Sequence, residues 1–470
     1  MSSTHQHRTA VAIAIAALIL GITGDALLRW IPWGLNVFLW TALFCAAAIA
    51  CARGARPVSR VPLLCALLVS AGIVWRDCET LVALDLLLLV LFLSMIALEA
   101  RGVRIQDAGL AQIGAGIIVT GVQSIAGVPQ LVLRDLSWSR VPSGGFRGAG
   151  VAVRGTLIAL PALLIFGSLL VAADETFARI LRELVLFDIS EAVVHVVVIV
   201  VIGAICAGFL RSLVLSGPVP HFEMSHIFTL PAAETNFALG LVNLLFALFV
   251  GVQFRYFFGS APAELAQYAR RGFFELVWVV ALVIPMLLLL EWLVNKERGM
   301  KLFRMLASVQ VALVFVIGAS ALNRMRLYRD EFGLTRLRFF TTAFMIWLGA
   351  LLIWFVVTVL TGRRNRFVIG ALATGITVVI ALHAVNPDRI IVETNVDRAR
   401  AGRRSFDVDY ATRLSADAVP SLVKNADIVG PIAIRRVVHR SRATGWRTWN
   451  WSRAQARRYE SNATPPIGRP

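Results

Sequence analysis

A series of apolar segments, each about long enough to cross a lipid bilayer, occupies residues 9 to 385. A transmembrane helix needs about 20 mostly apolar residues to span roughly 30 Å of hydrocarbon. Stretches such as 81–98 and 193–210 approach that length, whereas residues 386–470 contain no such stretch. Hydrophobic residues make up 58% of the chain and its mean hydropathy is +0.75. Most of the chain is therefore expected to fold in lipid rather than in water.

The expected fold class is all-α, because hydrocarbon offers no partner for the exposed backbone groups of an open sheet. An outer-membrane barrel would show alternating segments of about 10 residues, and such segments are absent. We predict a polytopic α-helical membrane protein with about 11–12 transmembrane helices and a short helical C-terminal tail. The candidate spans are 9–29, 34–53, 61–76, 81–100, 107–127, 151–172, 193–212, 235–254, 273–294, 302–322, 339–361 and 366–385.

The segment 107–127 is the weakest of these candidates. It contains Asp107, Gln112 and Gln123 among several glycines. If it spans, the chain crosses the membrane twelve times; if it does not, the C-terminal tail lies on the opposite side. The distribution of Lys and Arg over the loops favours twelve spans with both termini in the cytoplasm, although the basic stretch 134–154 argues against it.

The sequence divides into three parts. Residues 1–385 are predicted to form the transmembrane helical domain. Residues 386–425 are expected to be a helical cap docked at the membrane face, and residues 426–470 a basic, partly disordered tail. Helices in the last two parts are predicted at 387–402, 408–425 and 444–460.

The net charge of +18 comes almost entirely from arginine, since lysine occurs only at three positions. A basic membrane protein is expected to contact anionic lipid headgroups as well as the bilayer itself. A membrane-bound or cytoplasmic protein partner is also compatible with the sequence. No nucleic-acid-binding motif is present, so no nucleic-acid partner is predicted.

The sequence carries no recognisable cofactor, metal or catalytic motif. The five cysteines form no C-x-x-C pair, and an odd number leaves at least one unpaired within the chain. His221 and His226 do not have the spacing of a helical zinc motif. P-loop, dinucleotide-binding and nucleophile-elbow patterns are absent as well. We therefore predict no cofactor, no metal and no catalytic residue.

Ionisable residues within the spans are the first candidates for function, because each is costly to place in hydrocarbon. Asp85 lies in an otherwise apolar helix, Glu275 lies one turn inside another, and His195 and His383 lie near span ends. They could form a proton or ion path, or each could bond a neighbouring helix and fix packing. The packing interpretation is favoured for the histidines, and both remain open for Asp85.

Three stretches are dense in specific polar residues. The first stretch runs Tyr268-Ala-Arg270-Arg271-Gly-Phe-Phe-Glu275, and the second includes Arg324, Tyr328, Thr335 and Arg336. The third begins Asn386-Pro-Asp388 and continues through Asp409 to Pro420. In this order, over residues 80 to 425, the stretches resemble the bacterial integral membrane proteins of domain-of-unknown-function family 4173. That resemblance implies a multi-pass protein of the bacterial inner membrane and implies no activity.

The same motifs predict specific contacts. Arg270 and Arg271, at the end of a predicted membrane helix, can bind headgroup phosphates. Arg271 lies four residues before Glu275, so the two can form an ion pair along one helix. If Arg271 and Arg336 lie on one side of the membrane, they form a basic surface. That surface could hold a lipid headgroup or the acidic tail residues Asp388, Asp407, Asp409 and Asp417. Docking of the tail is favoured, with Arg336 paired to Asp409.

Three classes of function are compatible with these residues. The first is a scaffold or sensor-like membrane protein, which the absence of catalytic motifs favours. The second is a transporter or permease that uses Asp85 and Glu275 in its interior. The third is a membrane-embedded transferase, for which Asp388 and the histidines are the only candidates; it has the least support.

Overall fold

The computed structural model describes residues 3–53, 58–105, 109–135, 189–217, 230–257, 273–294, 300–403, 405–442 and 445–459, together with isolated positions between 155 and 179. Across these ranges the chain forms helices and no strand beyond one isolated bridge. Ten of the described helices are long and apolar enough to cross a membrane. The predicted all-α, polytopic fold is therefore confirmed.

The first half of the membrane domain is a bundle, here called bundle 1. Its helices are α1 (Ser3–Leu28), α2 (Leu35–Ala52), α3 (Arg60–Trp75), α4 (Glu79–Ala100), α5 (Leu110–Gln130) and α8 (Ile189–Val214). Their buried faces share one apolar core that includes Leu20, Phe44 and Leu210. Small residues allow α5 and α8 to approach closely: a Cβ on Gly208 would lie 1.9 Å from the carbonyl oxygen of Ser124.

The second half of the membrane domain, bundle 2, has its own core, with Phe303 and Phe355 at its centre. Its helices are α9 (Ala232–Phe257), α11 (Phe273–Leu293), α12 (Met300–Phe332), α13 (Arg336–Thr358), the short 3-10 helix η3 (Arg364–Arg366) and α14 (Phe367–Val385). Large apolar side chains such as Leu245 and Leu248 stay exposed on α9. Such a surface is stable only against the hydrocarbon of the bilayer.

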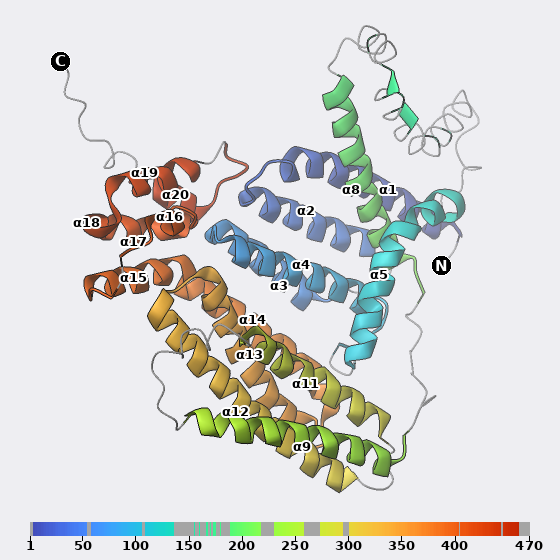
Figure 1. Cartoon of the computed structure of the whole chain (residues 1–470). Helices are drawn as coiled ribbons and strands as arrows, with labels where there is room; N and C mark the ends of the chain where they lie inside the picture. The colour runs from blue at the N-terminus through green and yellow to red at the C-terminus, as the bar shows by residue number, and fades with distance from the viewer. Residues whose placement is uncertain are drawn as a thin grey trace, which may run out of the picture.

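The two bundles meet where α4 packs against α14 (Figure 1). At one end of this seam Cys78 and Leu81 contact Leu382. At the other end Leu98 packs in a small apolar cluster with Val368. The two helices therefore run antiparallel along the boundary between the bundles.

The C-terminal helices form a compact layer over one end of both bundles, coloured orange to red in Figure 1. We call residues 387–457 the cap. Its helices are α15 (Pro387–Arg400), α16 (Val408–Ala411), η4 (Ala416–Ala418), α17 (Val419–Lys424), α18 (Ala426–Val429), α19 (Pro431–Arg440) and α20 (Trp451–Arg457). One core joins Ile391 and Leu422 to Val437 and Ala456. The boundary predicted at residue 425 falls inside that core.

Some of the helices predicted from the sequence are present in the structure, and others are not. The weak segment 107–127 corresponds to α5, which together with the π-turn that follows it is long and apolar enough to span. The predicted helix 387–402 is α15, but 408–425 is broken into three short helices and α19 was not predicted. Most of 151–172, and residues 460–470, lie outside the described residues. The side of the membrane on which each terminus lies stays a prediction.

Candidate functional site

The candidate site lies at the junction of the cap with the membrane helices, where α14 ends and α15 begins. Asn386 forms the junction with a left-handed backbone (φ 56°), which asparagine tolerates better than most residues. Its side chain caps α15 by accepting a hydrogen bond from the amide of Arg389 at 3.2 Å. Its amide group also donates to the carbonyl of Asp417 at 3.2 Å. The turn places Asp388, in the first turn of α15, on the side of the cap that faces the membrane helices.

Asp388 is fully buried and forms a two-point ion pair with Arg336, the first residue of α13. Arg336 donates from Nε to Oδ1 at 2.8 Å and from Nη2 to Oδ2 at 2.6 Å. Ser415 adds hydrogen bonds from its amide at 2.8 Å and its hydroxyl at 2.6 Å. Burial alone would raise the pKa of Asp388, but the bonds and charge of Arg336, with the Ser415 bonds, hold it below its usual value.

The turn between α12 and α13 holds Arg336 in place. Thr335 caps α13 by accepting from the amide of Arg338. The amide of Arg336 donates to the hydroxyl of Tyr410 at 2.7 Å. Asn395 bonds both the amide and the carbonyl of Leu334, each at 2.8 Å. Bundle 2 is thus fixed to the cap by side-chain and backbone bonds together.

A second buried carboxylate, Asp417, connects the cap to bundle 1. It accepts a hydrogen bond from the amide of Asp77 at 2.7 Å and another from the hydroxyl of Ser452. Arg76 lies 3.5 Å away as an ion-pair partner. Burial raises the pKa of Asp417, and these partners offset that effect only in part. The two carboxylates of the cap therefore have pKa values shifted in opposite directions.

Residues near the C-terminus close the junction from the other side. Arg453, only 2% exposed, donates from Nε to Asp77 at 2.7 Å and from Nη1 to the carbonyl of Thr448 at 2.6 Å. Its remaining nitrogen bonds the carbonyl of Trp33, in the loop between α1 and α2. An arginine fork in this position satisfies acceptors from three separate parts of the chain.

The last turn of α3 is capped by a residue distant in sequence. Asn450 donates from Nδ2 to the carbonyl of Ile73 at 2.8 Å and to that of Arg76 at 2.9 Å. Such carbonyls have no partner within their own helix. The segment that carries Asn450 therefore acts as a structural end piece for bundle 1.

Directly beneath this junction, inside the membrane domain, Asp85 of α4 pairs with His383 of α14. Oδ2 of Asp85 lies 3.1 Å from Nε2 of His383, and the two residues are 1% and 5% exposed. The other ring nitrogen of His383 lies 2.9 Å from the carbonyl of Val379. Arg76 donates to the carbonyl of His383 at 2.8 Å. The polar network of the cap thus reaches the seam between the bundles.

The structure brings some of the predicted residues together and separates others. Thr335, Arg336, Asn386 and Asp388 meet at the junction, and Asp85 lies just below it. The predicted pairing of Arg336 with Asp409 is wrong: Arg336 binds Asp388 instead. Asp409 is exposed, because the short helix α16 turns its neighbour Tyr410 inward.

The remaining predicted residues lie away from the junction. Arg324 is buried within α12, and the ring of Tyr328 supports the guanidinium of Arg338 at 4.1 Å. Glu275 is exposed in the first turn of α11. Tyr268, Arg270 and Arg271 lie outside the described residues, so the Arg271–Glu275 pair stays a prediction.

Several residues of the junction were not predicted from the sequence, namely Arg76, Asp77, Ser415, Asn450, Ser452 and Arg453. Asp417 was expected among the acids that dock the tail, but at a surface formed by Arg271 and Arg336, and the Asn450–Arg453 segment has the pattern of a capped helix start. Neither signal indicates a partner more than 300 residues away. Among the described residues, no group of three or more His, Cys, Asp or Glu side chains could hold a metal ion.

Comparison with known proteins gives one match. A family model described as Domain of unknown function (DUF4153) matches residues 63–425. The match begins inside α3 and ends in the cap just after α17. The family number 4173, suggested by the motifs, is not confirmed. Neither the curated proteins nor the solved structures contain a match.

Proposed function

This chain belongs to the DUF4153 family, and we propose that it is a scaffold or sensor-like membrane protein in which the cap ties the arrangement of the two bundles to a surface outside the membrane. One observation carries the proposal: the buried carboxylates of the cap bind opposite bundles. Asp388 binds Arg336 of bundle 2, and Asp417 binds Asp77 and Arg76 of bundle 1.

The energetics of these contacts support a coupling role. A buried ion pair contributes little net stability, but loss of one partner is strongly destabilising because a charge is left unpaired. A shift of one bundle relative to the other would break one set of these bonds. The cap is therefore expected to move as one rigid body when one bundle shifts relative to the other.

The outward face of the cap offers a surface to a protein partner. On α19 pairs of buried residues alternate with pairs of exposed residues, which include Arg435 and Arg436. A cationic face of this kind suits an acidic partner surface. We place this face, with both termini, in the cytoplasm of a bacterium whose inner membrane holds the bundles. Reporter fusions after residue 128 and at the C-terminus test that orientation.

Distance measurement by paired spin labels tests the coupling. One label replaces exposed Arg413 of the cap, and the other replaces exposed Leu245 of bundle 2 in one sample or exposed Leu68 of bundle 1 in a second. Both distance distributions are expected to be narrow in the wild type. Asp388→Asn should broaden the distance to bundle 2 more than the distance to bundle 1. Equal distributions in the wild type and the variant would contradict the proposal.

A transporter or permease is the second candidate, and the Asp85–His383 pair favours it. The pair bridges α4 and α14 at the seam, where alternating access between two bundles would require movement. A carboxylate and an imidazole in contact are also suited to carrying a proton. If the protein transports protons with a substrate, Asp85→Asn should abolish proton flux into proteoliposomes while folded protein remains at wild-type amounts. Flux that persists in this variant excludes the role of Asp85.

A further inference from the structure

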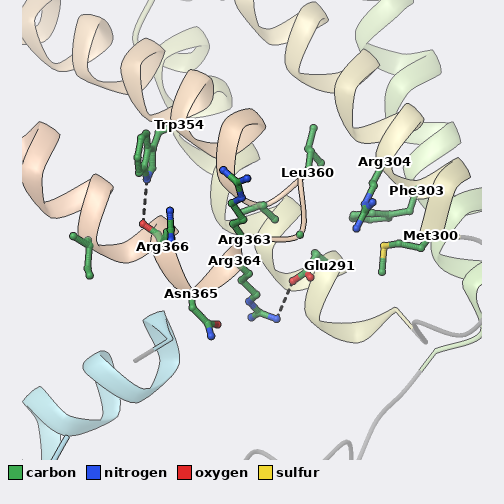
Figure 2. Close-up of a pocket in the computed structure, with 13 residues that line it drawn as sticks. Glu291, Met300, Phe303, Arg304, Trp354, Leu360, Arg363, Arg364, Asn365 and Arg366 are labelled. Carbon is green, nitrogen blue, oxygen red and sulfur yellow. Dashed lines mark hydrogen bonds and ion pairs between the residues drawn. The ribbon is translucent and has the colours of Figure 1, made fainter. Parts of the chain in front are cut away.

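A cavity of about 900 Å³ opens at the end of bundle 2 that lies opposite the cap. It lies where α11 ends, α12 begins and α13 turns through η3 into α14, as Figure 2 shows. Arginines line it from two elements: Arg304 from α12, and Arg363, Arg364 and Arg366 from the turn. None of the motifs noted in the sequence includes these residues.

The charges of the described residues around the cavity do not balance. Among the lining residues that the structure describes, Glu291 is the one acidic side chain, and it forms an ion pair with Arg364 at 2.8 Å. Arg304, Arg363 and Arg366 add three further positive charges. All three side chains are exposed, so they can reach a ligand in the cavity without breaking the fold.

The turn that carries the arginines is held in one conformation. The amide of Arg363 donates to the carbonyl of Thr358 at 2.7 Å. Gly362 adopts a left-handed backbone (φ 82°), and a Cβ there would lie 3.4 Å from Nη2 of Arg304. Trp354 donates from Nε1 to the carbonyl of Arg366 at 3.3 Å. The glycine therefore lets the turn approach Arg304, and the tryptophan fixes its far end.

We propose that this cavity binds a phosphate group at the membrane surface. Guanidinium groups bind phosphate oxygens in pairs and keep their charge at any physiological pH. Tryptophan near a helix end is typical of the headgroup level of a bilayer, and Phe303, Leu360 and Ile369 give the cavity an apolar wall. An anionic phospholipid headgroup and a free phosphate or phosphorylated solute carry the same chemistry. The proposal is independent of the scaffold function.

Arginines at a helix end also occur simply because they reach the lipid–water boundary. In that case phosphate binding would depend on the net charge of the protein and not on which arginines carry the charge. A matched pair of double variants separates the two explanations. The cavity variant is Arg304→Glu/Arg363→Glu, and the control is Arg403→Glu/Arg413→Glu, which changes the net charge equally at exposed positions of the cap.

The experiment has two arms on the purified full chain. In the first, nanodiscs of phosphatidylcholine contain a trace of spin-labelled phosphatidylglycerol, and the bound fraction is measured. In the second, equilibrium dialysis in phosphatidylcholine nanodiscs measures binding of radiolabelled inorganic phosphate. Loss of two guanidiniums should weaken binding roughly 10-fold or more, whereas the control should bind as the wild type does. Thermal unfolding checks that both variants fold.

The arms distinguish the source of the phosphate. Binding in the first arm alone assigns the cavity to a lipid headgroup, and binding in the second assigns it to a soluble phosphate. Either result supports the site if the cavity variant loses binding and the control does not. Equal binding by the two variants, or no binding by the wild type in either arm, overturns the proposal.

Discussion

Arg336 and Asp388 lie 52 residues apart in sequence, and their side chains form a two-point ion pair with N···O distances of 2.8 and 2.6 Å. Arg336 begins a membrane helix, and Asp388 lies in the first turn of the first helix of the cap. The pair therefore fixes the cap to bundle 2 at the point where the chain leaves the membrane domain.

Replacing one partner of this pair should be costly. Asp388→Asn leaves the partly buried Arg336 guanidinium with an incomplete set of acceptors, so we expect a loss of about 2–4 kcal/mol in the free energy of unfolding. Denaturation in detergent, followed by tryptophan fluorescence, measures it. Asp409→Asn is the control, because Asp409 is exposed, and it should change stability by less than about 0.5 kcal/mol. Similar losses in both variants would be evidence against the assigned pair.

The two carboxylates of the cap predict opposite pH dependences. The folded pKa of Asp388 is lowered from 3.8, so its contribution to stability is present above that value and is lost as the pH falls through the folded pKa. The folded pKa of Asp417 is raised from 3.8, so its contribution is present below 3.8 and is lost as the pH rises through the folded pKa.

Melting temperatures recorded against pH test this pattern. Asp417→Asn should remove part of the stability loss that the wild type shows as the pH rises above 3.8. Asp388→Asn should remove part of the loss on the acid side of 3.8. Two variants with pH profiles parallel to the wild type would show that neither carboxylate titrates as assigned.

Gly72 leaves room for the Asp85–His383 pair because it has no side chain. A Cβ on Gly72 would lie 2.8 Å from Nε2 of His383 and 3.1 Å from Oδ2 of Asp85, and these two buried side chains are held by their contact with each other. Gly72→Ala should therefore lower the free energy of unfolding by about 1–3 kcal/mol through overpacking. Gly318→Ala, where a Cβ would meet nothing within 4 Å, should be neutral or slightly stabilising. A thermal shift assay compares them, and equal shifts would argue against the pair geometry.

The spans were predictable because the length of an apolar segment is a local property of the sequence. The weak segment 107–127 illustrates this: its polar residues lower its hydropathy without breaking the helix. The meeting of the second and third motifs at one face also followed from their positions at span ends. These features depend on residues that are neighbours in sequence.

The partners of the motif residues were not predictable from one sequence. The choice of Asp388 over Asp409 depends on the rotation of α15 and α16 against the cap core, which is set by tertiary packing. The contact of Arg453 with Asp77 joins residues 376 positions apart, and that of His383 with Asp85 joins residues 298 apart. The arginine cavity likewise combines residues from separate helices.

The cap closes over both bundles through its two buried carboxylates, Asp388 and Asp417. Cys78 reports on this closure, because it lies in the turn between α3 and α4 and is fully buried, with Sγ 3.9 Å from Oδ1 of Asp388 in the cap. Burial raises the pKa of its thiol to about 12, which suppresses the reactive thiolate. Replacing the other four cysteines by alanine leaves Cys78 as the only labelling site.

The rate at which a water-soluble maleimide labels Cys78 is the most direct measurement. We expect slow labelling in the otherwise wild-type protein and labelling at least roughly 10-fold faster in Asp388→Asn, because opening of the cap exposes the thiol. Asp409→Asn should label as slowly as the wild type. Rapid labelling of the wild type, or equal rates with and without the Asp388 carboxylate, would contradict the claim that this pair holds the cap closed.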